Sequence, residues 1–489
     1  MFYSPPEIAI INLMYIDGIV RKLVNQVSGI TADSRNVKPG FVFVCLSEVA
    51  KKFVSDAVKA GARFIVAGSA EALPRVDNAQ IIIFPKQHDF YYKLASAFYR
   101  GRQPEFVAAV TGTNGKTSVA DFCRQIWHLT GNTGASIGTL GTAVGGIVTP
   151  YGSTLLTTPD AMELHKTLSE LYNSHVKYLC IEASSHGMAQ KRLYGVKVSV
   201  AAFTNLSRDH SDYHGGMEKY WAAKRKLFSE VLSHEGCAVL NADSGRYAEL
   251  RRLVGSRNTI TYGINVGDVR LTRLKSSTLG HNVAVEICGK VVYDGAFPVL
   301  GKFQIPNLLC ALAIVTASGA RCSDIPIDKL VSPRGRMELI GGRVIVDYAH
   351  TPAALEHALT SLKWHGFPQK IVLVFGCGGD RDREKRGAMG MVAGKYADVI
   401  IVTDDNPRNE NPEAIRKEIL SHCERAIEIP NRSDAIHYAV NFAVRNDHML
   451  LIAGKGHETT QQIAGESIEF NDGDVVRSCL RAMQGAYAD

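Results

Sequence analysis

A glycine-containing segment between two apolar stretches carries the clearest chemistry in this 489-residue chain. An apolar run at 106–110 leads into TGTNGKT at 111–117, and apolar residues then recur at helical spacing as far as Leu129. This pattern predicts a strand, a tight loop and a helix. Glycines let backbone N–H groups turn toward a phosphate, and the helix dipole favours an anion. Lys116 could reach the terminal phosphates, and the Thr117 hydroxyl could bind Mg²⁺.

The segment therefore predicts a nucleoside triphosphate site. Its predicted ATP-binding residues are Gly112, Thr113, Asn114, Gly115, Lys116 and Thr117. Only two residues separate the glycines, whereas the usual P-loop has four, so a helix-capping turn is the alternative interpretation.

Two later apolar runs also end in polar residues. The run at 178–181 ends in Glu182, and the run at 198–203 leads to a polar cluster that contains His210. Ligands of an open parallel sheet lie beyond the carboxyl ends of the strands, so both side chains would lie beside Thr117. A carboxylate, an imidazole and a hydroxyl could hold Mg²⁺, although a capping glutamate and a structural histidine are the alternative.

The stretch 217–228 has helical periodicity, and Lys224 lies four residues from both Tyr220 and Phe228. This places the lysine on a largely apolar stripe. The pattern alone favours an ammonium group that extends to water, since lysines commonly bury only their methylene stem.

Four apolar runs in the last third of the chain each end in a polar or glycine-rich cluster. The clusters are DYAHTP at 347–352, GCGGDRD at 376–382, TDDNPR at 403–408 and GKGHE at 454–458. Helical stretches separate them, which is typical of a doubly wound domain with one binding edge.

The first hundred residues predict a smaller α/β unit. Its Asp33-Ser34-Arg35 turn could contact a pyrophosphate, or could be only a polar Asx-type turn, and the sequence favours neither. We expect three domains, at 1–104, 105–332 and 333–489.

Composition narrows the class of ligand and the compartment. The formal charge is +7 without a Lys/Arg-rich run, which favours acidic small molecules over nucleic acid. The ten cysteines are scattered without a CxxC pair, as expected for reduced core residues. Neither a signal peptide nor an apolar run of membrane-spanning length is present, so we expect a cytoplasmic protein without membrane insertion.

The order and spacing of these motifs resemble the Mur ligase family over nearly the whole chain. The motifs that carry the resemblance are TGTNGKT, LTTPD (155–159), EASSHG (182–187), TNLSRDHSDYHG (204–215), YWAAKRKLF (220–228), GRME (335–338), DYAHTP, GCGGDRD, DNPR (405–408) and GKGHE.

The resemblance implies a three-domain α/β architecture, with a P-loop-type central domain and a doubly wound, Rossmann-like C-terminal domain. It also implies a monomeric, Mg²⁺- and ATP-dependent ligase of cytoplasmic peptidoglycan precursor synthesis. Its small-molecule substrates would be ATP, UDP-N-acetylmuramoyl-L-alanyl-D-glutamate and meso-diaminopimelate, joined through an acyl phosphate.

Residue roles follow from the same resemblance. Lys116, His210 and Lys224 would be catalytic, and Lys224 would be a carbamate, which reverses the interpretation from pattern alone. The implied metal site comprises Thr117, Glu182, His210 and the Lys224 carbamate. Further ATP-binding residues are Asn307, Arg336 and Asp347. The UDP-sugar-peptide residues are Ser34, Thr157, Thr158, Ser184, Gln190 and Arg192. The amino-acid site comprises Arg381, Asp405, Asn406, Pro407, Arg408, Gly454 and Glu458.

Arg408 bears on which amino acid is added. A guanidinium can grip the extra carboxylate of meso-diaminopimelate, which L-lysine lacks. The alternative is a surface ion pair of Arg408 with Asp404 or Glu410.

The chain departs from the family pattern at Gln304, where relatives commonly have Asn, at Gly387, which replaces a usual proline, and at 47–53, which lacks a typical turn. Three other classes of protein are alternatives: a folylpolyglutamate synthase, a P-loop ATPase with a mechanical or regulatory function, and a non-catalytic nucleotide-binding protein.

Overall fold

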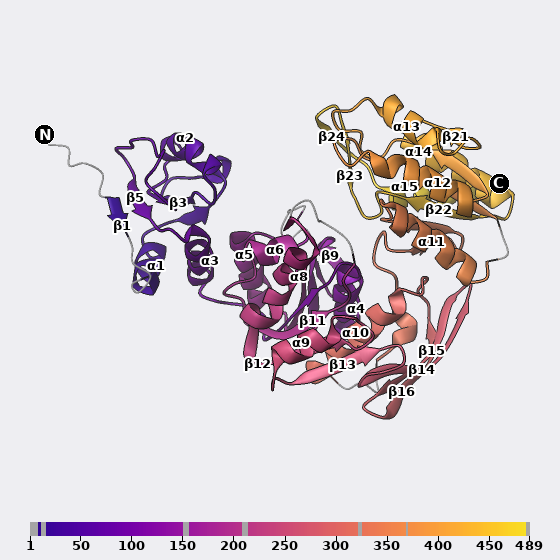
Figure 1. Ribbon diagram of the computed structural model, residues 1–489, viewed down its shortest axis with the longest axis horizontal. Helices are drawn as coiled ribbons and strands as arrows, with labels where there is room; N and C mark the ends of the chain where they lie inside the picture. The colour runs from indigo at the N-terminus through magenta and orange to yellow at the C-terminus, as the bar shows by residue number, and fades with distance from the viewer. Residues whose placement is uncertain are drawn as a thin grey trace, which may run out of the picture. The chain divides into compact units, whose positions relative to one another are not determined.

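A computed structural model describes residues 8–10, 16–149, 156–207, 214–320, 325–367 and 370–485. The chain, whose helices and strands are labelled in Figure 1, divides into two compact units. The first unit comprises Met1–Thr261 and Ala313–Ala320, and the second comprises Tyr262–Leu312 and Arg321–Asp489. The predicted domain limits at 104 and 332 stay a prediction.

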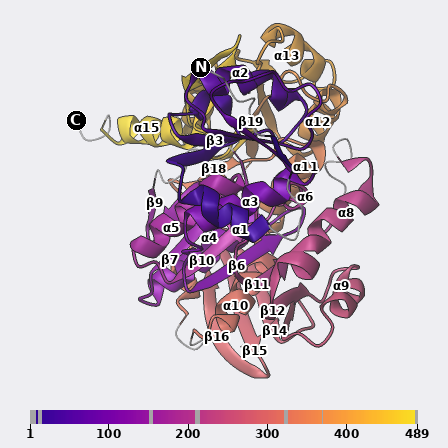
Figure 2. The same cartoon turned by 90° about the vertical axis from the view of Figure 1, so that its left-hand side faces the viewer.

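The first unit opens with a five-stranded parallel sheet in the order β1-β5-β4-β3-β2. Its strands are β1 (Ile8–Ile10), β2 (Gly29–Thr31), β3 (Phe41–Val44), β4 (Phe64–Ala67) and β5 (Gln80–Ile83). Its helical segments are α1 (Ile16–Val24), η2 (Ser34–Asn36), η3 (Val49–Phe53), α2 (Val54–Lys59) and α3 (Gln87–Phe98). α1 and α3 lie side by side (Figure 2), and Val20, Phe90 and Leu94 are buried in one core with the sheet.

Seven strands of the same unit form its central sheet, in the order β12-β11-β6-β10-β7-β8-β9. They are β6 (Phe106–Thr111), β7 (Gly134–Gly138), β8 (Gly141–Val144), β9 (Ile147–Thr149), β10 (Tyr178–Glu182), β11 (Val198–Phe203) and β12 (Leu232–Asn241). β10 and β11 pair with β6 on either side, all parallel, with Glu182 opposite Val110 and Phe203 opposite Thr111. The three carboxyl ends therefore meet at one edge, as the sequence predicted.

Helices cover this sheet because its parallel strands are apolar on both faces. They are α4 (Lys116–Leu129), α5 (Ala161–Asn173), α6 (Ser185–Ala189), α8 (Met217–Lys226) and α9 (Tyr247–Val254), with a π-helical segment η4 (Leu227–Val231) after α8. Leu164, Leu168, Phe203 and Trp221 belong to one buried core beside the sheet.

The second unit contains an antiparallel ribbon of β14 (Val269–Ser277), β15 (Gly280–Ile287) and β16 (Lys290–Phe297). β13 (Thr259–Gly263) and α10 (Gln304–Ala317) cross the division between the units, and a short turn η6 (Ile327–Lys329) follows.

A six-stranded sheet in the order β17-β18-β22-β19-β20-β21 completes the second unit. Its strands are β17 (Glu338–Ile340), β18 (Val344–Asp347), β19 (Ile371–Phe375), β20 (Val399–Val402), β21 (Ile427–Glu428) and β22 (Met449–Ala453), with a hairpin of β23 (Thr460–Ile463) and β24 (Glu466–Glu469). Its helices are α11 (Pro352–Trp364), α12 (Glu384–Tyr396), α13 (Pro412–Leu420), α14 (Arg432–Arg445) and α15 (Asp472–Gly485). β18, β22, β19 and β20 are adjacent and parallel, so the four predicted clusters leave from one edge.

The α/β fold class predicted from the sequence is confirmed. Nine cysteines lie in the described ranges; all nine are free, and seven of them are buried. No helix within those ranges is long and apolar enough to cross a membrane.

Candidate functional site

The phosphate loop connects β6 to α4, as predicted. Gly115 caps α4 in a left-handed conformation with φ of 88°. Gly112 has φ of 149°, and a Cβ there would lie 1.8 Å from Thr204 Oγ1. Only glycine is compatible with such a close approach, because any side chain would displace the chain segment after β11.

That segment after β11 holds the phosphate loop in place. The Thr113 N–H donates to the Asn205 carbonyl at 2.8 Å, and the Asn114 N–H donates to Asn205 Oδ1 at 3.1 Å. The Thr204 hydroxyl donates to the Asn114 carbonyl at 2.6 Å. Asn205 accepts hydrogen bonds from two N–H groups of the loop, so these two groups are already occupied. The start of α4 is therefore the part best placed to bind an anion, because the positive end of the helix dipole lies there.

Thr117 and Glu182 meet beneath this loop. The Thr117 hydroxyl donates to Glu182 Oε2 at 3.0 Å, and Glu182 is only 2% exposed. The Thr139 N–H donates to Glu182 Oε1 at 2.8 Å, which fixes the carboxylate. Gly138 leaves room for it, since a Cβ at 138 would lie 2.1 Å from Oε1. A hydroxyl and a carboxylate are the oxygen ligands that Mg²⁺ takes from proteins, with phosphate oxygens completing the shell.

Lys224 also points at the phosphate loop. It is 1% exposed, and its Nζ donates to the Gly112 carbonyl at 2.7 Å while lying 4.4 Å from the centre of the Tyr220 ring. The extension to water favoured by the pattern alone is therefore wrong, because α8 packs with this face toward the loop. Lys116 folds back to the carbonyls of Gly112 and Thr113, at 3.0 and 2.9 Å. His210 lies outside the described residues.

Five of the predicted UDP-sugar-peptide residues lie close together on the loops around β10. The Thr158 hydroxyl donates to the Glu182 carbonyl at 2.7 Å, and its oxygen lies 3.0 Å from Ser184 Oγ, within hydrogen-bond distance. The Arg192 guanidinium donates to the Thr158 carbonyl at 2.6 Å and to Gln190 Oε1. Thr157 accepts a hydrogen bond from the Thr139 hydroxyl at 3.2 Å.

The sixth residue, Ser34, is the first residue of η2, the short helical turn that follows β2 of the first sheet. There the Asp33 carboxylate accepts the Arg35 N–H at 3.0 Å and pairs with the Arg35 guanidinium. The Asx-type turn is thus formed, while contact of this turn with a pyrophosphate stays a prediction.

The remaining predicted ATP residues belong to the second unit. Asn307 donates to Gln304 Oε1 at 2.9 Å, so the unusual glutamine is bonded to a predicted ATP residue. Arg336 lies 4.7 Å from the centre of the Tyr348 ring. Arg336 Nε and Gln304 Nε2 are buried and have no hydrogen-bond partner among the described residues, as expected for donors that await a ligand.

Two titratable groups beside Arg336 have displaced pKa values. Burial raises the pKa of Asp347 to about 6, although the Arg336 charge opposes the shift. Burial lowers the pKa of His457 to about 3, and Arg336 lowers it further. The Asp347 carboxylate accepts the Met337 N–H at 2.7 Å.

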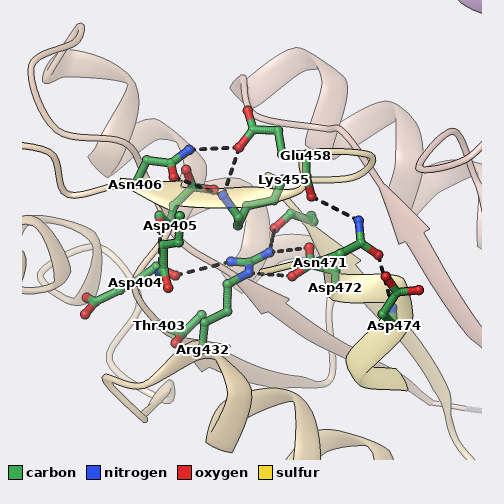
Figure 3. Close-up of polar contacts among 12 residues, drawn as sticks. Thr403, Asp404, Asp405, Asn406, Arg432, Lys455, Glu458, Asn471, Asp472 and Asp474 are labelled. Atoms are coloured by element: carbon green, nitrogen blue, oxygen red, sulfur yellow. Dashed lines mark hydrogen bonds and ion pairs between the residues drawn. The ribbon is translucent and has the colours of Figure 1, made fainter. Parts of the chain in front are cut away.

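Six of the seven predicted amino-acid residues lie on the loops after β20 and β22. Figure 3 shows three of them, Asp405, Asn406 and Glu458. Asn406 donates from Nδ2 to Glu458 Oε2 at 2.8 Å. Gly454 lies close to the Asp405 side chain. A Cβ at 454 would lie only 2.6 Å from Asp405 Oδ2. Arg381 is exposed on the neighbouring loop after β19.

The backbone of Arg408 is left-handed, with φ of 51°. Backbone hydrogen bonds to β23 and to the residue after β23 hold it in this conformation. Its guanidinium donates to the Gly379 carbonyl at 2.8 Å and to Gln462 Oε1 at 3.1 Å. Pro407 precedes it, and a Cβ at Gly379 would lie 2.0 Å from the Pro407 carbonyl oxygen.

Arg408 forms no ion pair within the described ranges, so the alternative of a surface ion pair is wrong. Asp404 pairs instead with Arg416, and Glu410 pairs with Arg386 and Arg383. The acceptors that the Arg408 guanidinium contacts among the described residues are therefore uncharged.

Sequence reasoning missed three residues that hold the site. Thr139 and Asn205 orient Glu182 and the phosphate loop, and each follows a strand of the central sheet. Lys455, in the GKGHE motif, bonds to Asn406 and Glu458. Strand-end position could have indicated the first two, and motif membership the third.

Two family models match the chain. Residues 110–315 match the Mur ligase middle domain, and residues 335–456 match the Mur ligase, glutamate ligase domain. The chain belongs to the Mur ligase family.

Individual relatives match over nearly the full length. A UDP-N-acetylmuramoyl-L-alanyl-D-glutamate–2,6-diaminopimelate ligase of Anaplasma marginale is 75% identical, covering 97% of this chain and 100% of the relative. The ligase of the same name from Rhizobium meliloti is 42% identical, covering 93% and 94%. A solved structure of a ligase with this name is 31% identical, with a TM-score of 0.66, and covers 94% of this chain and 95% of that one.

Proposed function

We propose that this chain is an ATP-dependent ligase that adds meso-diaminopimelate to UDP-N-acetylmuramoyl-L-alanyl-D-glutamate during peptidoglycan precursor synthesis. The observation that carries the proposal is Arg408, whose guanidinium has no carboxylate partner among the described residues and lies on the same loop as Asn406. The names of relatives at 75% and 42% identity support the same activity.

The reaction needs two displacements. First, an oxygen of the D-glutamyl carboxylate attacks the γ-phosphorus of ATP, and the bond to the bridging oxygen breaks, giving an acyl phosphate and ADP. The amine of meso-diaminopimelate then attacks the acyl carbon, and inorganic phosphate leaves as the amide forms and the nitrogen loses a proton. Both reactants of the first step are anions, so charge neutralisation and positioning dominate catalysis.

Each group at the phosphate loop has a role in the first step. The start of α4 and Lys116 would hold the triphosphate, and Thr117 and Glu182 would hold Mg²⁺. When bound, Mg²⁺ supplies positive charge beside the phosphate oxygens. His210 would complete the metal site, and Arg336, Asp347 and Asn307 would contact ATP.

Lys224 would act as a carbamate. Its ammonium would lose one proton, the neutral nitrogen would bond to the carbon of CO₂, and a second proton would then leave that nitrogen. The cation would thus become an anionic carbamate, which is suited to a second Mg²⁺. Burial at 1% exposure supports this, since burial disfavours the charged ammonium.

Selectivity for meso-diaminopimelate would arise at Arg408. The guanidinium can bind the distal carboxylate through two parallel hydrogen bonds, whereas bound L-lysine would leave two cations facing each other without that carboxylate. Repulsion between these two cations, together with the missing carboxylate, would disfavour bound L-lysine and so give strong discrimination.

The cellular setting forms part of the proposal. We expect a monomer in the reducing cytoplasm, in keeping with nine free cysteines in the described ranges. The folylpolyglutamate synthase alternative is less consistent with the DNPR loop and with the named relatives.

An endpoint assay tests the function. The purified chain is given ATP and Mg²⁺ with UDP-N-acetylmuramoyl-L-alanyl-D-glutamate, or with the same compound lacking D-glutamate, and with either amino acid. We expect product only from the D-glutamyl substrate and meso-diaminopimelate. ATP turnover that needs no amine would instead support a P-loop ATPase, and no turnover would support a non-catalytic nucleotide-binding protein.

A further inference from the structure

Lys455 is a fully buried lysine in the middle of the predicted amino-acid site. Its side chain is 0% exposed and turns into the protein between two glycines of positive φ, Gly454 at 114° and Gly456 at 55°. A Cβ at 454 would lie 2.6 Å from Asp405 Oδ2, and a Cβ at 456 would lie 2.8 Å from the Tyr348 Cα. The Gly-Lys-Gly sequence therefore lets the loop pass close to its neighbours while Lys455 points inward.

The ammonium group of Lys455 has three hydrogen-bond acceptors in the protein, two of which, on Asn406 and Glu458, are shown in Figure 3. Its Nζ lies 3.0 Å from Asn406 Oδ1, 2.9 Å from Glu458 Oε2 and 2.8 Å from the Thr460 carbonyl oxygen. An ammonium has three N–H donors, so none is left for a substrate. Lys455 can thus influence a bound amino acid only through Asn406 and Glu458.

Lys455 determines which way the Asn406 amide faces. Asn406 Oδ1 receives the Lys455 ammonium and also the Gln462 N–H at 3.0 Å, and both of these groups can only donate. Asn406 Nδ2 consequently faces Glu458 Oε2, at 2.8 Å. In the opposite orientation the NH₂ group would meet two donors and lose both hydrogen bonds. One N–H of Asn406 remains for a ligand, and it can only donate.

The same lysine balances the charge of Glu458. That carboxylate is 30% exposed, and its Oε2 takes hydrogen bonds from Lys455 and Asn406. The second oxygen, Oε1, is not committed to either group and can only accept. The pair of residues thus presents one donor, on Asn406, and one acceptor, on Glu458.

We propose that Lys455 is a positioning residue that sets amino-acid selectivity by holding Asn406 as a donor and Glu458 as an acceptor. A donor next to an acceptor matches a ligand carbon that carries both a carboxylate and an ammonium, which is the distal end of meso-diaminopimelate. L-Lysine has only the ammonium there and leaves the Asn406 N–H unpaired. This inference rests on the proposed function and adds orientation to the charge that Arg408 supplies.

The test replaces Lys455 by methionine, which keeps the length of the side chain and removes its donors. We expect the ratio of kcat/KM for meso-diaminopimelate to that for L-lysine to fall by about 10-fold or more, because Asn406 can then turn over. The KM for ATP should stay within about twofold of its original value, since ATP contacts are not involved. Lys455→Gln, which retains a donor, should restore part of the ratio.

Arg416→Met is the matched control, since Arg416 is another buried cation of this unit and pairs with Asp404 and Glu428. It should lower the thermal midpoint and leave the amino-acid ratio unchanged. In a double-mutant cycle, Lys455→Met should add little to Asn406→Leu if Lys455 acts through Asn406.

Separate outcomes contradict the inference and the proposed function. No product from the unmodified chain with either amino acid contradicts the function itself. Active Lys455→Met enzyme with an unchanged ratio, or with equal rises in KM for ATP and both amino acids, shows that Lys455 only supports the fold. If Lys455→Met does not fold, Lys455→Gln takes its place: the expected fall in the ratio is smaller, and an unchanged ratio contradicts the inference.

Discussion

The Thr117 hydroxyl lies 3.0 Å from Glu182 Oε2 although 65 residues separate the two along the chain. Thr117 lies in the first turn of α4, the helix after β6, and Glu182 ends the adjacent parallel strand β10. The pairing of two strands thus creates a hydroxyl–carboxylate pair directly beneath the phosphate loop, at a place that is almost closed to water.

Removing the charge of Glu182 should weaken metal-dependent turnover. Glu182→Gln keeps the shape and can still accept the Thr139 N–H, but its amide is a poorer ligand for Mg²⁺ than a carboxylate. We expect kcat to fall by about 10²-fold and the Mg²⁺ concentration for half-maximal rate to rise. Steady-state rates over a Mg²⁺ titration provide the measurement.

Glu249→Gln is the control for this substitution. Glu249 also accepts hydrogen bonds from several side chains, those of Trp221, Arg225 and Arg246, and lies on α9 away from the phosphate loop. It should leave the Mg²⁺ requirement unchanged. An unaltered Mg²⁺ requirement in Glu182→Gln would remove Glu182 from the metal site.

Replacing Lys224 should abolish most activity, and short carboxylates should restore part of it. Lys224→Ala opens a buried space beside the Gly112 carbonyl and Tyr220, into which formate or acetate can bring the lost negative charge. Lys219→Ala, at an exposed position of the same helix, serves as control and should need no rescue. Carbon NMR with ¹³C-bicarbonate should show a carbamate signal that Lys224→Ala lacks. Full activity of Lys224→Ala would exclude the carbamate.

Two neutral histidines hold Gly301 in the second unit. The His281 Nε2–H donates to the Gly301 carbonyl at 3.3 Å, and the Gly301 N–H donates to His365 Nε2 at 2.8 Å. The two rings lie 4.7 Å apart, so a proton on one disfavours a proton on the other. Burial lowers the pKa of His281 from 6.5 to about 4 and also lowers the pKa of His365.

This arrangement predicts loss of stability in acid. A histidine with a lowered pKa contributes stability that is fully present above 6.5 and is lost as the pH falls toward about 4, because the unfolded chain binds the proton first. Each such group contributes a slope of about 1.4 kcal/mol per pH unit inside that window. The raised pKa of Asp347, about 6, changes the free energy of unfolding with pH in the opposite direction. The contribution of His281 must therefore be measured by comparing the pH dependence of variants with that of the unmodified chain.

His281→Phe should flatten the fall of the thermal midpoint between pH 6.5 and about pH 4, relative to the unmodified chain. His437→Phe, at an exposed position, should leave the original pH dependence. Parallel curves for His281→Phe and the unmodified chain would show that His281 is not protonated on unfolding. Calorimetric scans at several pH values supply the data.

Strand ends made much of the site predictable. Glu182 and the four C-terminal clusters each follow an apolar run, and parallel strands bring their carboxyl ends to one edge, so sequence order was enough to group them. The direction of Lys224 was not predictable, because it depends on how α8 packs. Lys455 depends on two glycines of positive φ, which a hydrophobic pattern does not report. Thr139 becomes part of the site only through the pairing of β7 with β10.

The last prediction concerns the amino acid that is added. Arg408 is anchored by Gly379 and Gln462, and Gly378 leaves room for it, since a Cβ at 378 would lie 2.8 Å from an Arg408 Nη atom. A polar site of this kind can reject an analogue that lacks its partner by roughly 10⁴-fold. We therefore expect a strong preference for meso-diaminopimelate over L-lysine in kcat/KM.

Arg408→Ala should lose most of this preference, mainly through slower use of meso-diaminopimelate. Arg408→Lys should recover only part of it, because an ammonium keeps the charge without the two parallel hydrogen bonds of a guanidinium. Arg383→Ala is the control, since Arg383 is exposed, pairs with Glu410 and should not affect the choice of amino acid. Comparable kcat/KM for the two amino acids in the unmodified enzyme would contradict the assignment of Arg408, because binding of the distal carboxylate by its guanidinium must favour meso-diaminopimelate.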